Sequence, residues 1–125
     1  MWSKQPDAGG VKIPKLVQQH TIDRILRHAE RSYRGRYQRL EVRFRGALCY
    51  IDAYVDAGVS TGESTGGEIE DVPTHLCRLR YFGHEDQWSF SFFTYSNMKY
   101  ELAVFPDGSF YGTPEDAFDA AAVYL

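Results

Sequence analysis

Three features of the sequence predict an α+β domain in which a four- to five-stranded antiparallel meander carries an N-terminal and a C-terminal helix on one face. The window over residues 88–96 is aromatic and alternates with a period of two, as expected of a strand. Short turn sequences separate it from strand-like neighbours, which favours antiparallel hairpins. Helix signals stand before and after this block. The expected order is therefore helix, four or five strands, helix.

The chain of 125 residues is long enough for one domain with its own core. Residues 1–12 are polar and without periodicity, so we expect a disordered tail there and a single domain over residues 13–125. Residues 57–73 are rich in Gly, Ser, Thr and Glu and predict a flexible loop. This loop lacks Gly-Lys-Ser/Thr, and its acidic residues would repel phosphate, which argues against a phosphate-binding loop.

The first helix is expected from Thr21, a suitable N-cap, to a point near Gly35. Residues 15–20, after Pro14, fit either a short extended piece or a first helical turn. Its apolar residues recur with helical spacing at Ile22, Ile25, Leu26, Ala29 and Tyr33. The opposite side of the helix carries Arg24, Arg27, His28 and Arg31. A solvated surface explains this basic side as well as a ligand would.

Residues 39–56 have the composition of one long strand. Its apolar residues switch from even to odd positions, so they would switch from one face of a regular strand to the other. Val42 and Phe44 are even-numbered, whereas Cys49 and Ile51 are odd-numbered. A β-bulge or sharp bend at Arg45-Gly46 would bring both pairs to one face, because glycine accommodates the backbone that such an irregularity uses. Without this irregularity, unpaired guanidinium groups would point into the core, at a high cost in free energy.

Further strands are expected over residues 74–82, 88–96 and 100–105, with a short fifth over residues 109–111. Asn97-Met98 is expected to reverse the chain, since asparagine tolerates the left-handed conformation. The C-terminal helix has the clearest start in the sequence. Thr113 is a suitable N-cap, Pro114 suits the first helical position, and acidic residues follow in the first turn.

One face of the sheet is expected to form the core beneath both helices. Trp88, Phe90 and Phe92 lie on this face by the alternation of side chains along a strand. The same alternation assigns to it the residues Cys49, Ile51, Ala53, His75, Cys77, Leu79, Tyr81, Leu102 and Val104.

The other side of the sheet, called the second face below, mixes aromatic and charged residues. By alternation it holds Tyr50, Asp52, Tyr54, Leu76, Arg78, Arg80, Ser89, Ser91, Phe93, Tyr95, Glu101 and Phe105. Exposed apolar area of this kind is typical of an interaction site. The candidate binding face comprises Tyr50, Asp52, Tyr54, Arg78, Arg80, Phe93 and Tyr95. It fits a homodimer interface or a protein partner, in which Asp52 and Glu101 would pair with Arg78 and Arg80 across strands.

Charge is divided unevenly along the chain. Residues 11–45 carry a net +7, and residues 46–125 carry a net −10. The basic segment suits an anionic partner such as nucleic acid, with Arg24, Arg27 and Arg31 as candidate anion-binding residues. Alternatively, the acidic part neutralises the basic part within the fold or between subunits. On the second face, Asp52 and Glu101 would oppose phosphate, so nucleic acid is not the favoured partner.

Cys49, His75 and Cys77 are the residues closest to a metal-binding pattern. They fall on one expected face, but apolar neighbours share it, and buried free cysteine is common in cores. We therefore expect no metal and no cofactor. Two cysteines are also too few for a secreted disulfide framework.

The leading functional hypothesis is a non-enzymatic binding module that self-associates through the second face. The alternative is a small enzyme with a pocket between that face and residues 57–73, using His75 or Asp52, although no Ser/His/Asp or Cys/His signature is present. The sequence has neither a long apolar run nor the apolar segment of a signal peptide. A cytoplasmic protein without a membrane partner is expected.

Overall fold

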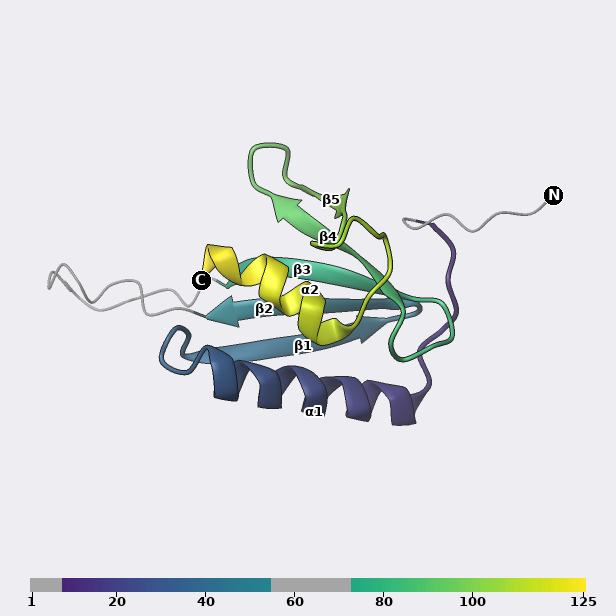
Figure 1. Cartoon of the computed structure of the whole chain (residues 1–125), viewed down its shortest axis with the longest axis horizontal. Coiled ribbons are helices and arrows are strands. Elements are labelled where there is room, and N and C mark those ends of the chain that lie inside the picture. Colours follow the sequence, from purple (N-terminus) through teal and green to yellow (C-terminus); the bar gives the residue numbers. More distant parts are fainter. Residues whose placement is uncertain (1–7, 55–72) are drawn as a thin grey trace, which may run out of the picture.

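A computed structural model of the chain describes residues 8–54 and 73–125. Its elements in order are α1 (Lys15–Ser32), β1 (Arg39–Arg45), β2 (Leu48–Tyr54), β3 (Thr74–Tyr81), β4 (Trp88–Thr94), β5 (Lys99–Ala103), α2 (Pro114–Ala121) and a 3₁₀ turn (Ala122–Tyr124). The strands form one sheet in the order β1-β2-β3-β4-β5, each antiparallel to its neighbours (Figure 1). The predicted α+β meander with a helix at each end is confirmed.

Helix α1 begins at Lys15, so residues 15–20 are helical, which is one of the two possibilities left open for them, and the start expected at Thr21 is too late. Thr21 is not a cap. It is buried inside the helix, and its hydroxyl donates to the Val17 carbonyl at 2.7 Å. A threonine that bonds to the preceding turn resembles a cap in sequence, which explains the wrong start. The buried stripe is Val17, Thr21, Ile25 and Ala29, whereas Leu26 is 41% exposed.

The expected long strand over residues 39–56 is a hairpin, so the irregularity expected at Arg45-Gly46 is a chain reversal rather than a bulge within one strand. Its expected consequence is confirmed, because Val42, Phe44, Cys49 and Ile51 all lie on the core side. Arg45 pairs with Leu48, and Gly46-Ala47 forms the two-residue loop between them. Gly46 has φ +60°, which suits the first central position of a type II′ turn. Reversal of the chain explains the parity change, because Phe44 pairs with Cys49 and these partners share a face.

A register shift occurs instead between β2 and β3. Ile51 pairs with Cys77 and Asp52 pairs with His75, so Leu76 is the extra residue of a β-bulge. Leu76 and Cys77 are both fully buried in the core, and His75 lies on the second face beside Asp52. The expected places of His75 and Leu76 are therefore wrong, because strict alternation fails at a bulge.

In β5, residues expected on one side of the sheet lie on the other side. Leu102 pairs with Ser91 and so lies on the second face, whereas Glu101 pairs with Phe92 on the helix side. Val104 is 49% exposed rather than in the core. Phe105 is buried, with its ring centroid 4.5 Å from that of Phe90.

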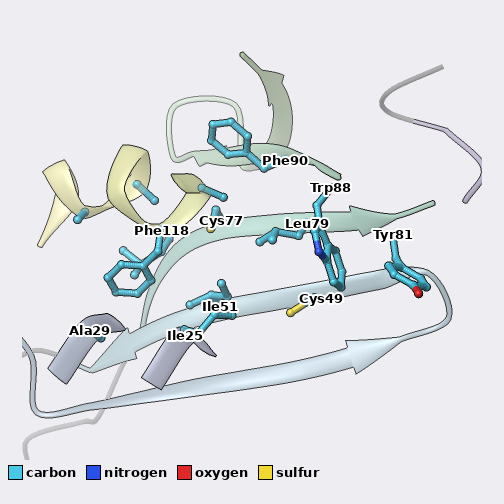
Figure 2. Close-up of a cluster of buried hydrophobic side chains, with 14 of the residues drawn as sticks. Ile25, Ala29, Cys49, Ile51, Cys77, Leu79, Tyr81, Trp88, Phe90 and Phe118 are labelled. Carbon is cyan, nitrogen blue, oxygen red and sulfur yellow. The ribbon is translucent and has the colours of Figure 1, made fainter. Parts of the chain in front are cut away.

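Both helices lie on the face of the sheet that carries the apolar core (Figure 1). Trp88 and Phe90 on β4 are fully buried there with Leu79 on β3 and Phe118 on α2, as Figure 2 shows. Ile25 and Ala29 bring α1 into the same cluster. The predicted core of Trp88, Phe90 and Phe92 beneath the helices is thus confirmed, with Phe92 at its edge.

The segment between β5 and α2 is anchored by a single bridge between Trp88 and Gly112, and the expected strand over residues 109–111 is absent from it. A side chain on Gly112 would collide with the Phe105 ring, because a Cβ there would lie 2.8 Å from it. In the β4–β5 turn, Met98 takes the left-handed backbone that was expected of Asn97. Thr113 caps α2 as predicted, accepting from the Asp116 amide at 3.1 Å.

The chain before α1 lies against the end of β3. The Val11 amide donates to the Tyr81 carbonyl at 2.9 Å, and Arg80 donates to the Gly9 carbonyl at 2.9 Å. Residues 1–7 of the expected tail lie outside the described residues, as do residues 57–72 of the expected loop.

The role of Gly46 in the hairpin is to adopt positive φ, and it does not make room for a neighbouring group, since an added Cβ would have no atom within 4 Å. We expect Gly46→Val to lower the free energy of unfolding by about 1–2 kcal/mol, because valine is disfavoured at positive φ. Gly46→Asn should cost less, since asparagine tolerates this conformation. Urea unfolding measures both variants, and a Gly46→Val protein as stable as the wild type would contradict the assigned turn.

Candidate functional site

The second face combines basic, aromatic and acidic side chains in register across the strands. Its central row runs Arg43, Tyr50, Arg78, Ser91 and Leu102 from β1 to β5. Among the described residues, no helix packs over this side of the sheet. The seven residues of the predicted binding face, Tyr50, Asp52, Tyr54, Arg78, Arg80, Phe93 and Tyr95, all lie on it or at its edge.

Asp52 is the most buried charged residue of this face, with a side chain only 3% exposed. Its Oδ2 accepts from the Arg43 guanidinium at 2.8 Å, and its Oδ1 lies 3.0 Å from His75 Nδ1. Both carboxylate oxygens therefore have partners from neighbouring strands, as burial of a carboxylate requires. The carboxylate in turn holds the Arg43 and His75 side chains in fixed positions.

Aromatic rings surround His75 at the end of the face where β3 starts and β2 stops. The Phe93 centroid lies 4.8 Å from the His75 ring, and Tyr95 stacks on it at 6.1 Å. Tyr100 contacts both His75 and Phe93, at 6.4 and 5.0 Å. The Tyr95 hydroxyl accepts from the His75 amide at 2.8 Å, which fixes an otherwise exposed ring. We call Phe93, Tyr95, Tyr100 and His75 the aromatic cluster.

Three arginines lie over tyrosine rings on the same face. The guanidinium carbon of Arg39 is 3.8 Å from the Tyr54 centroid, that of Arg78 is 5.0 Å from Tyr100, and that of Arg43 is 5.2 Å from Tyr50. Such cation–π contacts fix the planar guanidinium parallel or oblique to a ring while its edges remain able to donate hydrogen bonds.

Tyr100 is the ring that joins the aromatic cluster to the arginines. Burial, then the nearby negative charge of Asp52, raises the pKa of its hydroxyl well above the ordinary value of 10. The hydroxyl therefore stays protonated at neutral pH. It can donate or accept a hydrogen bond, but it is a poor nucleophile and a poor proton donor.

Arg43, His75 and Tyr100 belong to the site although the sequence did not assign them to the second face. The bulge at Leu76 moves His75 there, and the hairpin at Gly46 places Arg43 opposite Tyr50. The irregularity expected at Arg45-Gly46 already turned Arg43 away from the core, but only a hairpin loop at Gly46-Ala47 pairs it with Tyr50. The bulge leaves no comparable signal in the sequence.

The candidate anion-binding residues of α1 have different surroundings from one another. Arg24 is engaged within the fold, since it donates to both Glu115 oxygens at 2.8 and 2.9 Å and contacts Asp86 at 2.9 Å. Arg27 and Arg31 line an open hollow on the surface of α1 with Leu26 and Glu30. Arg24 therefore contributes to packing within the fold, whereas Arg27 and Arg31 lie at the surface of α1.

Two histidines add to the contacts between α1 and the acidic second half of the chain. His20 Nδ1 lies 3.2 Å from Glu85, and His28 Nε2 lies 2.6 Å from Asp119, which also accepts from the Tyr33 hydroxyl. With Arg24, these contacts place acidic groups against the basic helix. This arrangement supports the alternative that the charge division is partly neutralised within the fold.

The Cys49, His75 and Cys77 set is split between the two faces. Both cysteines are buried on the core side, whereas His75 lies with Asp52 on the second face. Burial raises the pKa of both thiols, with smaller contributions from Cys77 to Cys49 and from the Asp52 charge to Cys77. In the part of the chain that the structure describes, no three His, Cys, Asp or Glu residues are placed to hold a metal ion.

The fold and site define a class: an α+β protein with helices on one face of an antiparallel meander and a basic, aromatic site on the other. Comparison of the chain with protein-family models, curated proteins and solved structures found no match. Over residues 8–54 and 73–125, neither helix has the length and apolarity needed to cross a membrane.

The contact between Arg24 and Glu115 predicts a dependence of stability on pH. Burial opposes ionisation of Glu115, but the hydrogen bonds and positive charge of Arg24 outweigh it and lower the pKa of Glu115 below 4.5. A carboxylate with a lowered pKa stabilises the fold above its ordinary pKa and loses that contribution as pH falls through the folded value. We expect Glu115→Gln to cost about 1–2 kcal/mol at pH 7 in urea unfolding, with the difference shrinking below pH 4.5.

Glu30→Gln is the matched control, because Glu30 pairs with Arg34 on the exposed surface of α1 at 3.5 Å. Its cost should stay below about 0.5 kcal/mol at every pH. Equal costs for the two variants, or a Glu115→Gln cost unchanged between pH 7 and pH 3, would contradict the stabilising role of Arg24 and Glu115.

Proposed function

We propose that this protein is a non-enzymatic binding module whose partner lies across the second face of the sheet. The observation that carries the proposal is Asp52, a carboxylate 3% exposed on a face over which no described helix packs. Its two contacts fix Arg43 and His75 among aromatic rings. Preorganised polar groups beside exposed rings are the usual makeup of an interaction surface, because little side-chain entropy is lost on binding.

A second copy of the chain is one candidate partner for this face. Tyr95 is 51% exposed and lies next to Phe93, so the aromatic cluster offers apolar area that a homodimer would bury. We place the dimer contact at this cluster rather than at the arginines, because like charges facing one another across an interface repel.

Self-association predicts the behaviour of Phe93→Ser/Tyr95→Ser. We expect the wild type to sediment as a dimer at high micromolar concentration and the double variant to shift toward monomer, since interface area is lost. Val123→Ser, which removes a 74% exposed residue elsewhere, is the control and should leave the distribution unchanged. A wild type that is monomeric at these concentrations would refute the homodimer, without deciding whether another partner binds.

An enzyme is the second candidate function, and the contact between Asp52 and His75 favours it. A carboxylate bound to Nδ1 orients an imidazole so that Nε2 can accept a proton, as in a general base. The pocket expected between the second face and residues 57–73 involves residues outside those described. The binding module remains the leading proposal, because neutral, protonated Tyr100 and the apolar rings supply recognition rather than a nucleophile.

A reducing, cytoplasmic location is part of the proposal. Cys49 and Cys77 lie on adjacent strands, and both are free and buried. Buried free thiols behave as small apolar side chains and are ordinary in reducing compartments.

NMR titration tests the binding module without assuming its partner. The Arg Nε–Hε and aromatic ring signals would be followed during a concentration series of the protein itself and on adding a mixed-sequence single-stranded oligonucleotide or poly-glutamate. We expect at least one probe to shift Arg78 and Tyr95 while Arg31 and Phe118 stay unchanged. If every probe left the second face unchanged, or shifted only α1, the proposed function would be wrong.

A further inference from the structure

The second face is basic even though the whole chain is acidic. Among residues 8–54 and 73–125 it carries Arg39, Arg43, Arg45, Arg78 and Arg80 against two acidic residues, Glu41 and Asp52, for a net charge of +3. The chain as a whole has a formal net charge of −3. Positive charge is therefore concentrated on the side of the sheet opposite the helices, which favours an anionic partner.

The acidic groups that would oppose phosphate on this face are displaced or occupied. Glu101, expected there, lies on the helix side, because it pairs with Phe92. Asp52 is buried, with Arg43 and His75 on its two oxygens. Glu41 accepts from the Tyr54 hydroxyl at 3.2 Å. The electrostatic objection to a phosphate-bearing ligand is thereby much reduced.

Four of the five arginines lie toward one end of the face, whereas Arg39 pairs with Tyr54 at the other end. Arg45 and Arg80 pair with Leu48 near the β1–β2 turn, and Arg43 and Arg78 pair with Tyr50 in the next row. The aromatic cluster follows at the opposite end, where β2 stops and β3 starts. A ligand that spans both ends needs anionic groups next to planar apolar groups.

We propose that the second face binds single-stranded nucleic acid, an inference that rests on the proposed binding function. Phosphates contact the arginine end, and bases stack on Tyr95, on Phe93 and on the outer surfaces of the guanidinium groups that lie over tyrosines. Rings and guanidinium planes stack on any base, so the recognition tolerates sequence. A duplex binds more weakly, because its bases are stacked on one another and hidden from the sheet.

The observations favour nucleic acid over an acidic protein segment. Carboxylates of a peptide would satisfy the arginines, but its aliphatic stems would leave the stacking surfaces of the aromatic cluster unused. The basic surface of α1 is a weaker site for the same ligand. Arg24 is held by Glu115 and Asp86, and Arg27 and Arg31 share their hollow with Glu30 and Leu26 rather than with rings.

Fluorescence anisotropy with labelled 12-nucleotide RNA and DNA of one mixed sequence tests the proposal. The face variant Arg45→Gln/Arg78→Gln and the helix variant Arg27→Gln/Arg31→Gln each remove two positive charges, and neither breaks an ion pair between described residues. We expect the face variant to bind roughly 20-fold more weakly at 0.1 M salt, with a shallower salt dependence, since two fewer counterions are released. The helix variant should bind within about twofold of the wild type. Circular dichroism melting checks that both variants fold.

Stacking is tested separately with Tyr95→Leu and with an abasic oligomer of the same length and charge. We expect Tyr95→Leu to weaken binding of the base-bearing strands at least about fivefold. The abasic oligomer should bind more weakly than either strand and be insensitive to Tyr95→Leu. Tighter binding of RNA than of DNA would identify RNA as the ligand, and tighter binding of DNA would identify DNA.

Three results would overturn the inference. These are no binding of either strand at 50 mM salt, loss of binding in the helix variant but not in the face variant, and equal affinity for the abasic oligomer. If poly-glutamate or a second copy of the chain still shifts Arg78 and Tyr95 in the NMR titration, only the ligand class is wrong. If no probe shifts them, the proposed function fails as well.

Discussion

One extra residue in β3 decides which side chains each face of this sheet presents. The bulge at Leu76 turns Leu76 and Cys77 into the core and leaves His75 beside Asp52. An unbroken strand would bury the imidazole among apolar side chains and expose leucine, and both changes are unfavourable. With the bulge, the core is apolar and the buried carboxylate of Asp52 has partners from β1 and β3. The arrangement of the second face depends on this local irregularity.

The two faces use charge in different ways. On the helix side, acidic residues of the β3–β4 turn and α2 contact Arg24, His20 and His28, and the ion pairs of Arg24 neutralise part of the positive charge of α1 within the fold. On the second face, arginines lie over tyrosine rings and retain hydrogen-bonding edges. The uneven charge along the sequence therefore contributes partly to stability, through contacts between helices, and partly to an electropositive surface.

The elements were largely predictable from the sequence, whereas the side of the sheet on which a residue lies was predictable only in regular stretches of strand. Local signals were sufficient for the capped start of α2 at Thr113 and for the alternating strand at Trp88. They failed where one residue changes the geometry: Gly46 makes a turn rather than a bulge, and Leu76 makes a bulge without a glycine to mark it. All seven candidate face residues are on the expected side, because Tyr50, Arg78 and Phe93 lie in regular stretches. Arg43, His75 and Tyr100 were missed, because their positions depend on pairing between strands.

Nuclear Overhauser contacts around the bulge show which side chains each face of the sheet presents. We expect ring protons of His75 to show contacts to Phe93 and Tyr100, and Leu76 methyl groups to show contacts to α2 and none to those rings. The opposite pattern, with Leu76 against Phe93 and Tyr100 and His75 among the core side chains, would contradict the bulge at Leu76. The composition of the second face, and the functions proposed for it, would then be wrong.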